Sequence, residues 1–209
     1  MSKMFVSNKK ETPRIFENNF LEFFSRVHPV VPLIIYLPLI SYMFYLGISE
    51  NLNYSDLILF FAGGYLFWHF TEYIIHRFIF HYEPKSEFGK KLHFIIHGVH
   101  HDYPSDPLRL VMPPSVSLPL AGVFFILFQK IIGIPAAYIF FAGFLFGYLA
   151  YDMTHYAIHN FAIKNNLWRK IKEHHMKHHF NDPQKGFAIS LPAFDKLFGT
   201  YSKNINREG

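Results

Sequence analysis

Long apolar segments dominate the hydrophobic pattern of this chain. A helix needs about 20 predominantly apolar residues to cross a bilayer. Four segments approach or reach that length, and they cover residues 30–48, 57–80, 116–134 and 136–153. The third is the weakest because Gln129 and Lys130 interrupt it, although a lysine near a helix end can extend its amine to the interface. The pattern predicts an all-α, multi-pass membrane protein with about four transmembrane helices, rather than a soluble core of buried helices.

The basic residues indicate how these helices are oriented. Of the 20 Lys and Arg residues, five precede the first apolar segment, five lie from Arg77 at the end of the second segment to Arg109, and nine follow the fourth segment. The remaining one, Lys130, falls near the short link between the third and fourth segments. With four spans, 19 of the 20 therefore lie on one side, which the positive-inside rule makes cytoplasmic. With three spans, the nine C-terminal basic residues would lie outside.

The polar segments give the expected domain organisation. Residues 1–29 are expected to form a polar arm that leads into an interfacial segment, and residues 30–209 to form one domain. The apolar residues of the interfacial segment are Phe16, Phe20, Leu21, Phe23 and Phe24. Residues 81–113 and 160–209 would together form a helical cap on the cytoplasmic face.

Composition excludes several kinds of site. The absence of cysteine excludes disulfides, thiolate-bound zinc, cysteine-ligated iron–sulfur clusters and thiolate-ligated haem. The formal net charge is +5, but the basic residues lie beside apolar stretches, so anionic lipid headgroups are the expected partner. Nucleic acid is not expected, since no basic arm with interleaved aromatic residues is present.

Histidine is the unusual residue of this sequence. Ten of its 14 histidines fall into short clusters at the expected cytoplasmic ends, and histidine is the commonest metal ligand. The ten are His76, His81, His97, His100, His101, His155, His159, His175, His178 and His179. Residues at i, i+3 and i+4 share a helix face, so the triplets 97/100/101 and 175/178/179 are each expected to present three imidazoles to one point. His76 and His81 are five residues apart, which requires a loosened helix end or ligation of different ions.

Ten ligands exceed what one ion takes, so the sequence predicts two metal ions with five imidazoles each. Neutral nitrogen ligands suit zinc, copper, iron and nickel, whereas calcium and magnesium prefer oxygen. Iron is the expected metal because it can activate dioxygen as a co-substrate, and zinc cannot change oxidation state. Zinc can nevertheless displace iron in a purified protein.

Carboxylates stand beside the ligands. Glu72 is one turn before His76, and Asp152 is three residues before His155. Both acids are expected to accept the second N–H of a metal-bound histidine, as such partners usually do. For Asp102 and Glu173 this role and an ordinary helix-end role stay equally open. Histidines outside the clusters are expected to be structural, and they are His28, His69, His93 and His174.

Four stretches of the chain resemble the fatty acid hydroxylase superfamily, and most closely its fatty acid 2-hydroxylases. They are EYIIHRFIFH from Glu72, HFIIHGVHHDYPSDPLRLVMPP from His93, GYLAYDMTHYAIH from Gly147, and KEHHMKHHFNDPQKGFAIS with FDKLFGTY from Lys172 onward. The RLVMPP stretch and the GF…FGTY ending favour 2-hydroxylases over sterol desaturase-like relatives.

The resemblance implies a cytoplasmic dimetal centre that inserts a hydroxyl next to the carbonyl of a fatty acid or sphingolipid N-acyl chain, using dioxygen and two electrons. The ten family ligands carry over to the ten clustered histidines, with His175 favoured over His174 because HMKHH has the i, i+3, i+4 spacing. Some relatives carry a fused cytochrome b-type haem domain. Residues 1–29 are too short for one, so a separate electron-donor protein is expected. The membrane would be the endoplasmic reticulum in a eukaryote and the inner membrane in a bacterium.

Other functions were weighed against this one. The same site could serve a sterol desaturase or carotenoid hydroxylase-type enzyme, or an aldehyde-forming enzyme. A metal transporter should place its ligands near the bilayer midplane, and a structural zinc site does not need ten ligands. Arg109 or Lys185 is a candidate for holding a polar headgroup. The candidates for lining the substrate path are Trp68, His69, Phe70, Tyr73 and Phe80.

Overall fold

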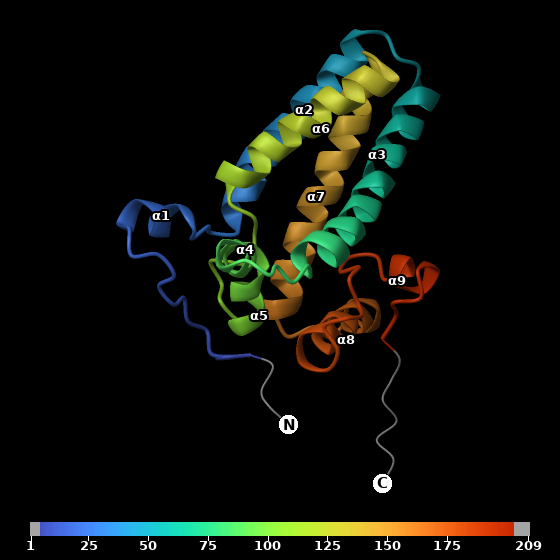
Figure 1. The fold of residues 1–209 in the computed structure, drawn as a ribbon. Coiled ribbons are helices and arrows are strands. Elements are labelled where there is room, and N and C mark those ends of the chain that lie inside the picture. The colour runs from blue at the N-terminus through green and yellow to red at the C-terminus, as the bar shows by residue number, and fades with distance from the viewer. Residues whose placement is uncertain (1–4, 203–209) are drawn as a thin grey trace.

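The computed structural model describes residues 5–202, and within that range it is helical with connecting loops and no strand (Figure 1). The helices are α1 (Asn19–Phe24), α2 (Val30–Ser49), α3 (Tyr54–Ile75), α4 (Glu87–His93), α5 (Val99–Asp102), α6 (Pro114–Ile132), α7 (Ala136–Asn160), α8 (Asn166–Phe180) and α9 (Ala193–Leu197). Two π-helical segments, His76–Phe80 and Phe94–Gly98, continue α3 and α4. The predicted all-α fold is confirmed.

Four of these helices are long and apolar enough to cross a membrane, as the sequence predicts. They are α2, α3 with its π-helical end, α6 and α7. The main difference from the expected boundaries is in α7, which continues to Asn160 instead of ending near residue 153. His155 and His159 therefore lie on the last turns of a spanning helix, and their positions are set by that helix.

Helix α7 forms the centre of the bundle. Its spanning window is 61% buried, compared with 17% for α2 and α6. It approaches α3 backbone to backbone, because a Cβ on Gly64 would lie 1.9 Å from the Phe140 carbonyl oxygen. A Cβ on Gly143 would likewise lie 2.0 Å from the Phe61 carbonyl oxygen. Small residues at crossing points are typical of helix packing within membranes.

The outer faces of the bundle are apolar. Ile34, Ile58 and Ile131 are 67%, 71% and 69% exposed in the chain alone. Large exposed apolar patches are unusual on a soluble monomer, and a bilayer would cover the apolar outer faces of these helices. The exposed faces and the four long apolar helices together describe an integral membrane protein.

The shorter helices gather at one end of the bundle (Figure 1). The arm before α2 is fixed there by Glu22, which is buried and forms ion pairs with Arg26 and Arg109. Phe20 and Phe23 on α1 are 68% and 73% exposed, as an interfacial segment requires. The arm was expected to cover residues 1–29 and the cap residues 81–113 and 160–209; residues 1–4 and 203–209 lie outside the described part of the chain.

The close approach of α3 and α7 makes Gly64 sensitive to substitution. Gly64→Ala forces a methyl group against a main-chain carbonyl, and overpacking of this kind costs about 1–3 kcal/mol. We expect a lower unfolding temperature for the detergent-solubilised variant. Gly122→Ala on α6 is the matched control, because no heavy atom lies within 4 Å of its added Cβ. Equal unfolding temperatures for the two variants would contradict this packing.

Candidate metal centre

The ten clustered histidines converge into two groups of five. The first group contains His76, His81, His97, His101 and His178, and the second contains His100, His155, His159, His175 and His179. Within each group, one ring nitrogen from every histidine lies within 4.8 Å of all the others. The side chains come from the ends of α3 and α7, from the α4–α5 segment and from α8. The expected division of five and five is thus present in the geometry.

The two triplets do not each face one point, contrary to the expectation. His97 and His101 belong to the first group, whereas His100 belongs to the second. The α8 triplet divides in the same way, with His178 in the first group and its two companions in the second. At 3.6 residues per turn, the i+3 and i+4 side chains point about 100° apart. Each triplet therefore supplies an i, i+4 pair to one group and its i+3 residue to the other.

A π-helical turn resolves the spacing of His76 and His81. Residues His76–Phe80 form this turn at the end of α3, and the His81 amide donates to the His76 carbonyl over 3.2 Å. The wider turn brings residues i and i+5 onto one side, and both histidines belong to the first group. The loosened helix end is therefore the correct alternative, and ligation of different ions is not needed.

The nitrogens of the first group cannot satisfy one another by hydrogen bonding. The Nε2 atoms of His76, His81 and His97 form a triangle with sides of 3.2, 3.2 and 3.3 Å. Each ring nitrogen of a neutral imidazole either donates or accepts, so at least one side of a triangle joins two atoms of the same kind. A cation among the three would accept all three lone pairs at once.

Two ring N–H groups of the first group point away from it towards main-chain carbonyls. His76 Nδ1 lies 2.6 Å from the Phe187 oxygen, and His178 Nδ1 lies 2.7 Å from the Lys185 oxygen. A carbonyl can only accept, so both Nδ1 atoms carry the proton and both Nε2 atoms present a lone pair. His178 Nε2 is buried and has no hydrogen-bond partner among the described residues. This is the arrangement that a metal-binding imidazole requires.

The second group has similar spacing. His175 Nε2 lies 2.9 Å from His159 Nε2, 3.0 Å from His179 Nε2 and 3.1 Å from His155 Nε2. Two nitrogens about 2.1 Å from one ion and at right angles to each other lie about 3.0 Å apart. The donor set and its spacing therefore fit a metal ion in each group.

Burial keeps these imidazoles neutral. It lowers the pKa of His81 to about 3 and that of His178 to about 4, and neighbouring histidines add to the effect at His81. Burial also lowers the pKa of His101 to about 2, and the proximity of His178 and His81 lowers it further. At neutral pH the groups present lone pairs, so protons compete little with a metal ion.

The two acids differ from their expected role. Among the hydrogen bonds of the described residues, none joins Glu72 to His76. Glu72 accepts from the amides of Ile189 and Ser190 and lies 3.2 Å from His69 Nδ1. The ring N–H of His76 instead donates to the main-chain carbonyl of Phe187. Asp152 is 1% exposed and makes no hydrogen bond to a histidine of either group in the described part of the chain.

The other histidines have structural partners. His174 Nε2 lies 2.8 Å from the carboxylate of Asp195, so His175 is the member of this pair that joins a metal group. His93 Nε2 lies 2.6 Å from the Phe80 carbonyl oxygen. His28 accepts from the Val30 amide at the start of α2.

The headgroup role considered for Arg109 is wrong. Its guanidinium is 3% exposed and is occupied by Glu22, Asp106 and the Pro13 carbonyl. It joins the N-terminal arm to the loop before α6. Lys185 is exposed and lies 3.6 Å from Asp182, and nothing in the structure assigns it a headgroup.

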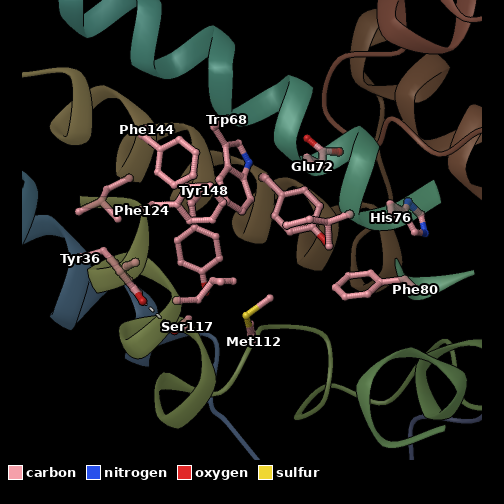
Figure 2. A pocket seen from close by; sticks show the side chains of 15 residues that line it. Tyr36, Trp68, Glu72, His76, Phe80, Met112, Ser117, Phe124, Phe144 and Tyr148 are labelled. Atoms are coloured by element: carbon pink, nitrogen blue, oxygen red, sulfur yellow. Dashed lines mark hydrogen bonds between the residues drawn. The ribbon is translucent and has the colours of Figure 1, made fainter. Parts of the chain in front are cut away.

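An apolar pocket runs between the spanning helices and ends beside the first group (Figure 2). Its empty volume, including the opening, is about 530 Å³. Trp68 and Phe80 line it as expected, whereas Phe70 and Tyr73 pack against Phe194 and Phe198 instead. Sequence reasoning did not find most of the lining, which includes Tyr36, Met112, Ser117, Leu120, Ala121, Phe124, Phe144, Leu145, Tyr148 and Tyr151. Their apolar spacing does not distinguish pocket lining from ordinary core.

Comparisons with known proteins agree with this geometry. A dihydroceramide fatty acyl 2-hydroxylase (FAH2) of Arabidopsis thaliana is 38% identical over 191 residues, which are 91% of this chain and 80% of the plant protein. The ceramide very long chain fatty acid hydroxylase SCS7 of Saccharomyces cerevisiae is 36% identical over 88% of this chain and 48% of the yeast protein. The fatty acid 2-hydroxylase of Mus musculus is 37% identical over 90% of this chain and 56% of its own length. This chain thus spans about half of the yeast and mouse proteins.

A solved structure and a family model give the same result. The structure of full-length scs7p, in which only the hydroxylase domain is visible, matches with a TM-score of 0.84 and 35% identity over 88% of this chain and 70% of that one. The fatty acid hydroxylase family model matches residues 61–200. The chain therefore belongs to the fatty acid hydroxylase family.

Proposed function

We propose that this protein is a membrane fatty acyl 2-hydroxylase that acts on the acyl chain of a sphingolipid or a related lipid. The observation that supports this most strongly is the pair of adjacent groups of five imidazoles, the first of which adjoins the end of an apolar pocket between spanning helices. In the reaction, a C–H bond next to the acyl carbonyl becomes C–OH. One oxygen atom of dioxygen enters the product, and the other leaves as water with two electrons and two protons. The names of the plant, yeast and mouse relatives support this reaction.

The ten clustered histidines would hold two metal ions, and iron is the metal that this reaction favours. Bound iron supplies the activation of dioxygen, which zinc cannot supply because it does not change oxidation state. The imidazoles would hold the ions through lone pairs that burial keeps free of protons. The main-chain carbonyls of Lys185 and Phe187 hold two of the rings in the orientation that this binding needs.

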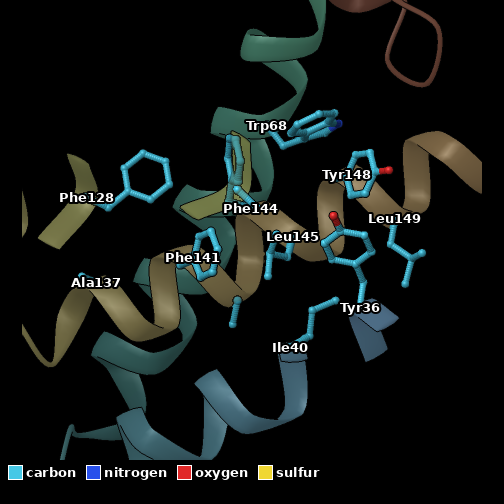
Figure 3. Close-up of a cluster of buried hydrophobic side chains, with 12 residues drawn as sticks. Tyr36, Ile40, Trp68, Phe128, Ala137, Phe141, Phe144, Leu145, Tyr148 and Leu149 are labelled. Carbon is cyan, nitrogen blue, oxygen red and sulfur yellow. The ribbon is translucent and has the colours of Figure 1, made fainter. Parts of the chain in front are cut away.

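The spanning helices would position the acyl chain. Trp68, Phe144 and Tyr148 form a wall where α3 and α7 meet (Figure 3), and all three line the pocket. His76 and Phe80 line its metal end. An acyl chain in this pocket would exclude water from it. The carbonyl end of the chain would lie beside the histidines, so that the carbon next to the carbonyl would face the metals. Fixing one C–H in reach of the reacting centre is the largest contribution that such a pocket can make.

We place the metal-bearing end on the cytoplasmic side. Nineteen of the 20 Lys and Arg residues belong to segments at that end in the four-span topology, and basic loops are retained on the cytoplasmic side. Each turnover needs two electrons, and we assign their supply to a separate donor protein that docks at this end. The bilayer would be the endoplasmic reticulum in a eukaryotic host and the inner membrane in a bacterial one.

Expression of the protein in a host without 2-hydroxylated lipids should yield 2-hydroxyacyl lipids. His100→Ala should reduce them to the host background, because it removes one of the five nitrogens of the second group. Lipid mass spectrometry with assignment of the hydroxyl position measures both results. His28→Ala is the matched control, since His28 is exposed and outside both groups. Wild-type product from His100→Ala would defeat the site, and a hydroxyl at another carbon would defeat the assigned regiochemistry.

A bulky residue in the pocket should block the acyl chain without disturbing the metals. Ala121 on α6 lines the pocket, whereas its neighbour Gly122 faces open space. Ala121→Phe should lower 2-hydroxylation by about 100-fold, the effect expected from a misplaced substrate. Gly122→Phe adds the same ring to the outer face and should retain activity. Metal analysis of both purified variants shows whether the centre is intact; equal activities at equal metal content would contradict this path for the acyl chain.

A further inference from the structure

Residues 185–190 form a non-helical strap between α8 and α9, and two buried carboxylates hold it. The amides of Phe187 and Ala188 each donate to Asp195 over 2.9 Å. The amides of Ile189 and Ser190 donate to Glu72 over 2.7 and 3.3 Å. Four successive main-chain N–H groups therefore bind side chains, although no helix or sheet is present to pair them.

Both carboxylates are surrounded by donors. Asp195 is fully buried and also accepts from the hydroxyl of Thr200 and from His174 Nε2. Glu72 is 4% exposed and also accepts from the Ser190 hydroxyl. Hydrogen bonds to a charged acceptor are shorter and stronger than neutral ones, and an unpaired buried amide is costly. These contacts fix the path of the strap.

The same strap carries the two carbonyls that orient histidines of the first group. Lys185 accepts from His178, and Phe187 accepts from His76. Gly186 lies between them with a φ of 76°, a left-handed conformation that strains other residues. A Cβ there would also lie 3.3 Å from the His178 Cβ. The carbonyls therefore face the histidines because the strap turns sharply at this glycine.

The second group does not have this support to the same extent. The Nδ1 atoms of His175 and His179 are buried and have no hydrogen-bond partner among residues 5–202. The strap contacts described above involve ring nitrogens of the first group alone. Loss of the strap should therefore affect the two groups unequally.

We infer that Asp195 and Glu72 are positioning residues for the first metal ion, and that they act through the strap on His76 and His178 without touching the metal. This inference rests on the proposed dimetal centre. Partners that orient a metal-bound histidine typically contribute 10–100-fold to metal affinity. Here the carboxylates lie one step further out, and the main chain transmits their effect. Because Glu72 also lines the pocket, Asp195 gives the cleaner test.

Asp195→Asn places an amide NH₂ where only donors face the side chain, so the strap should shift. We expect zinc affinity at one of the two sites to fall about 10–100-fold, with the other site unchanged. Purified protein is stripped, loaded with two equivalents of zinc and titrated with a chelator, so that each site releases its ion separately. Glu22→Gln is the matched control, since Glu22 also accepts from two successive amides, those of Ile15 and Phe16, but within residues 5–202 its hydrogen bonds and ion pairs include no histidine. It should retain both affinities.

Reference variants identify which site is weakened. His81→Ala removes a ligand from the first group, and His159→Ala removes one from the second. Adding Asp195→Asn to His81→Ala should cause little further loss, because both changes affect the same ion. Adding it to His159→Ala should weaken both ions. Such non-additivity reports that two residues act on one site, whereas a general loss of stability would weaken every variant alike.

The outcomes separate this inference from the proposed centre. Wild-type protein that binds fewer than two zinc ions would overturn the centre and the inference with it. Two wild-type ions that are both unaffected by Asp195→Asn, or both weakened equally, would overturn the inference alone. Weakening confined to the second site would do the same.

Discussion

The structure depends on ten imidazole lone pairs that face one another in a buried space. Neutral imidazoles cannot all be satisfied by mutual hydrogen bonds, as the triangle formed by His76, His81 and His97 shows. Protonation does not resolve the conflict, since burial lowers the pKa values of His97, His100 and His175. Cations that accept the lone pairs resolve it directly. The rest of the fold can be understood as the scaffold that holds these rings in place.

The scaffold joins the two histidine groups through shared helical segments. Helices α3 and α7 meet backbone to backbone at Gly64 and Gly143, and each carries histidines at its cap end. The α8 triplet then joins the two groups, because His178 lies in the first group while its companions lie in the second. The α4–α5 segment divides its histidines between the two groups in the same way. The two centres are therefore assembled together.

Much of this arrangement could be predicted from the sequence. Hydrophobic length predicted the four spans, and histidine spacing predicted the ten members of the two groups. The division of each triplet was missed because a shared helix face was treated as a single direction. The π-helical turn at His76 was one of two alternatives that spacing alone could not separate.

The missed partners share a physical cause. His76 and His178 are oriented by carbonyl oxygens of Phe187 and Lys185, and every residue has a carbonyl, so no residue type marks such a partner. Asp195 was missed for the same reason, because it binds the strap through main-chain amides, which every residue except proline has. Glu72 was found from its position beside His76, but its actual partners lie 117 and 118 residues away in the chain. Local spacing cannot identify contacts at that separation.

The relation between pocket and metals follows from shared helices. Trp68 lines the pocket and His76 joins the first group, and both belong to one continuous helical span whose eight-residue step is about 12 Å along the axis. Tyr148 and His155 are related in the same way on α7. A lipid chain held by Trp68 and Tyr148 would therefore lie at a fixed distance from His76 and His155. The strap orients His76 and His178 through its main-chain carbonyls, so the geometry of the first group also has a support outside the spanning helices.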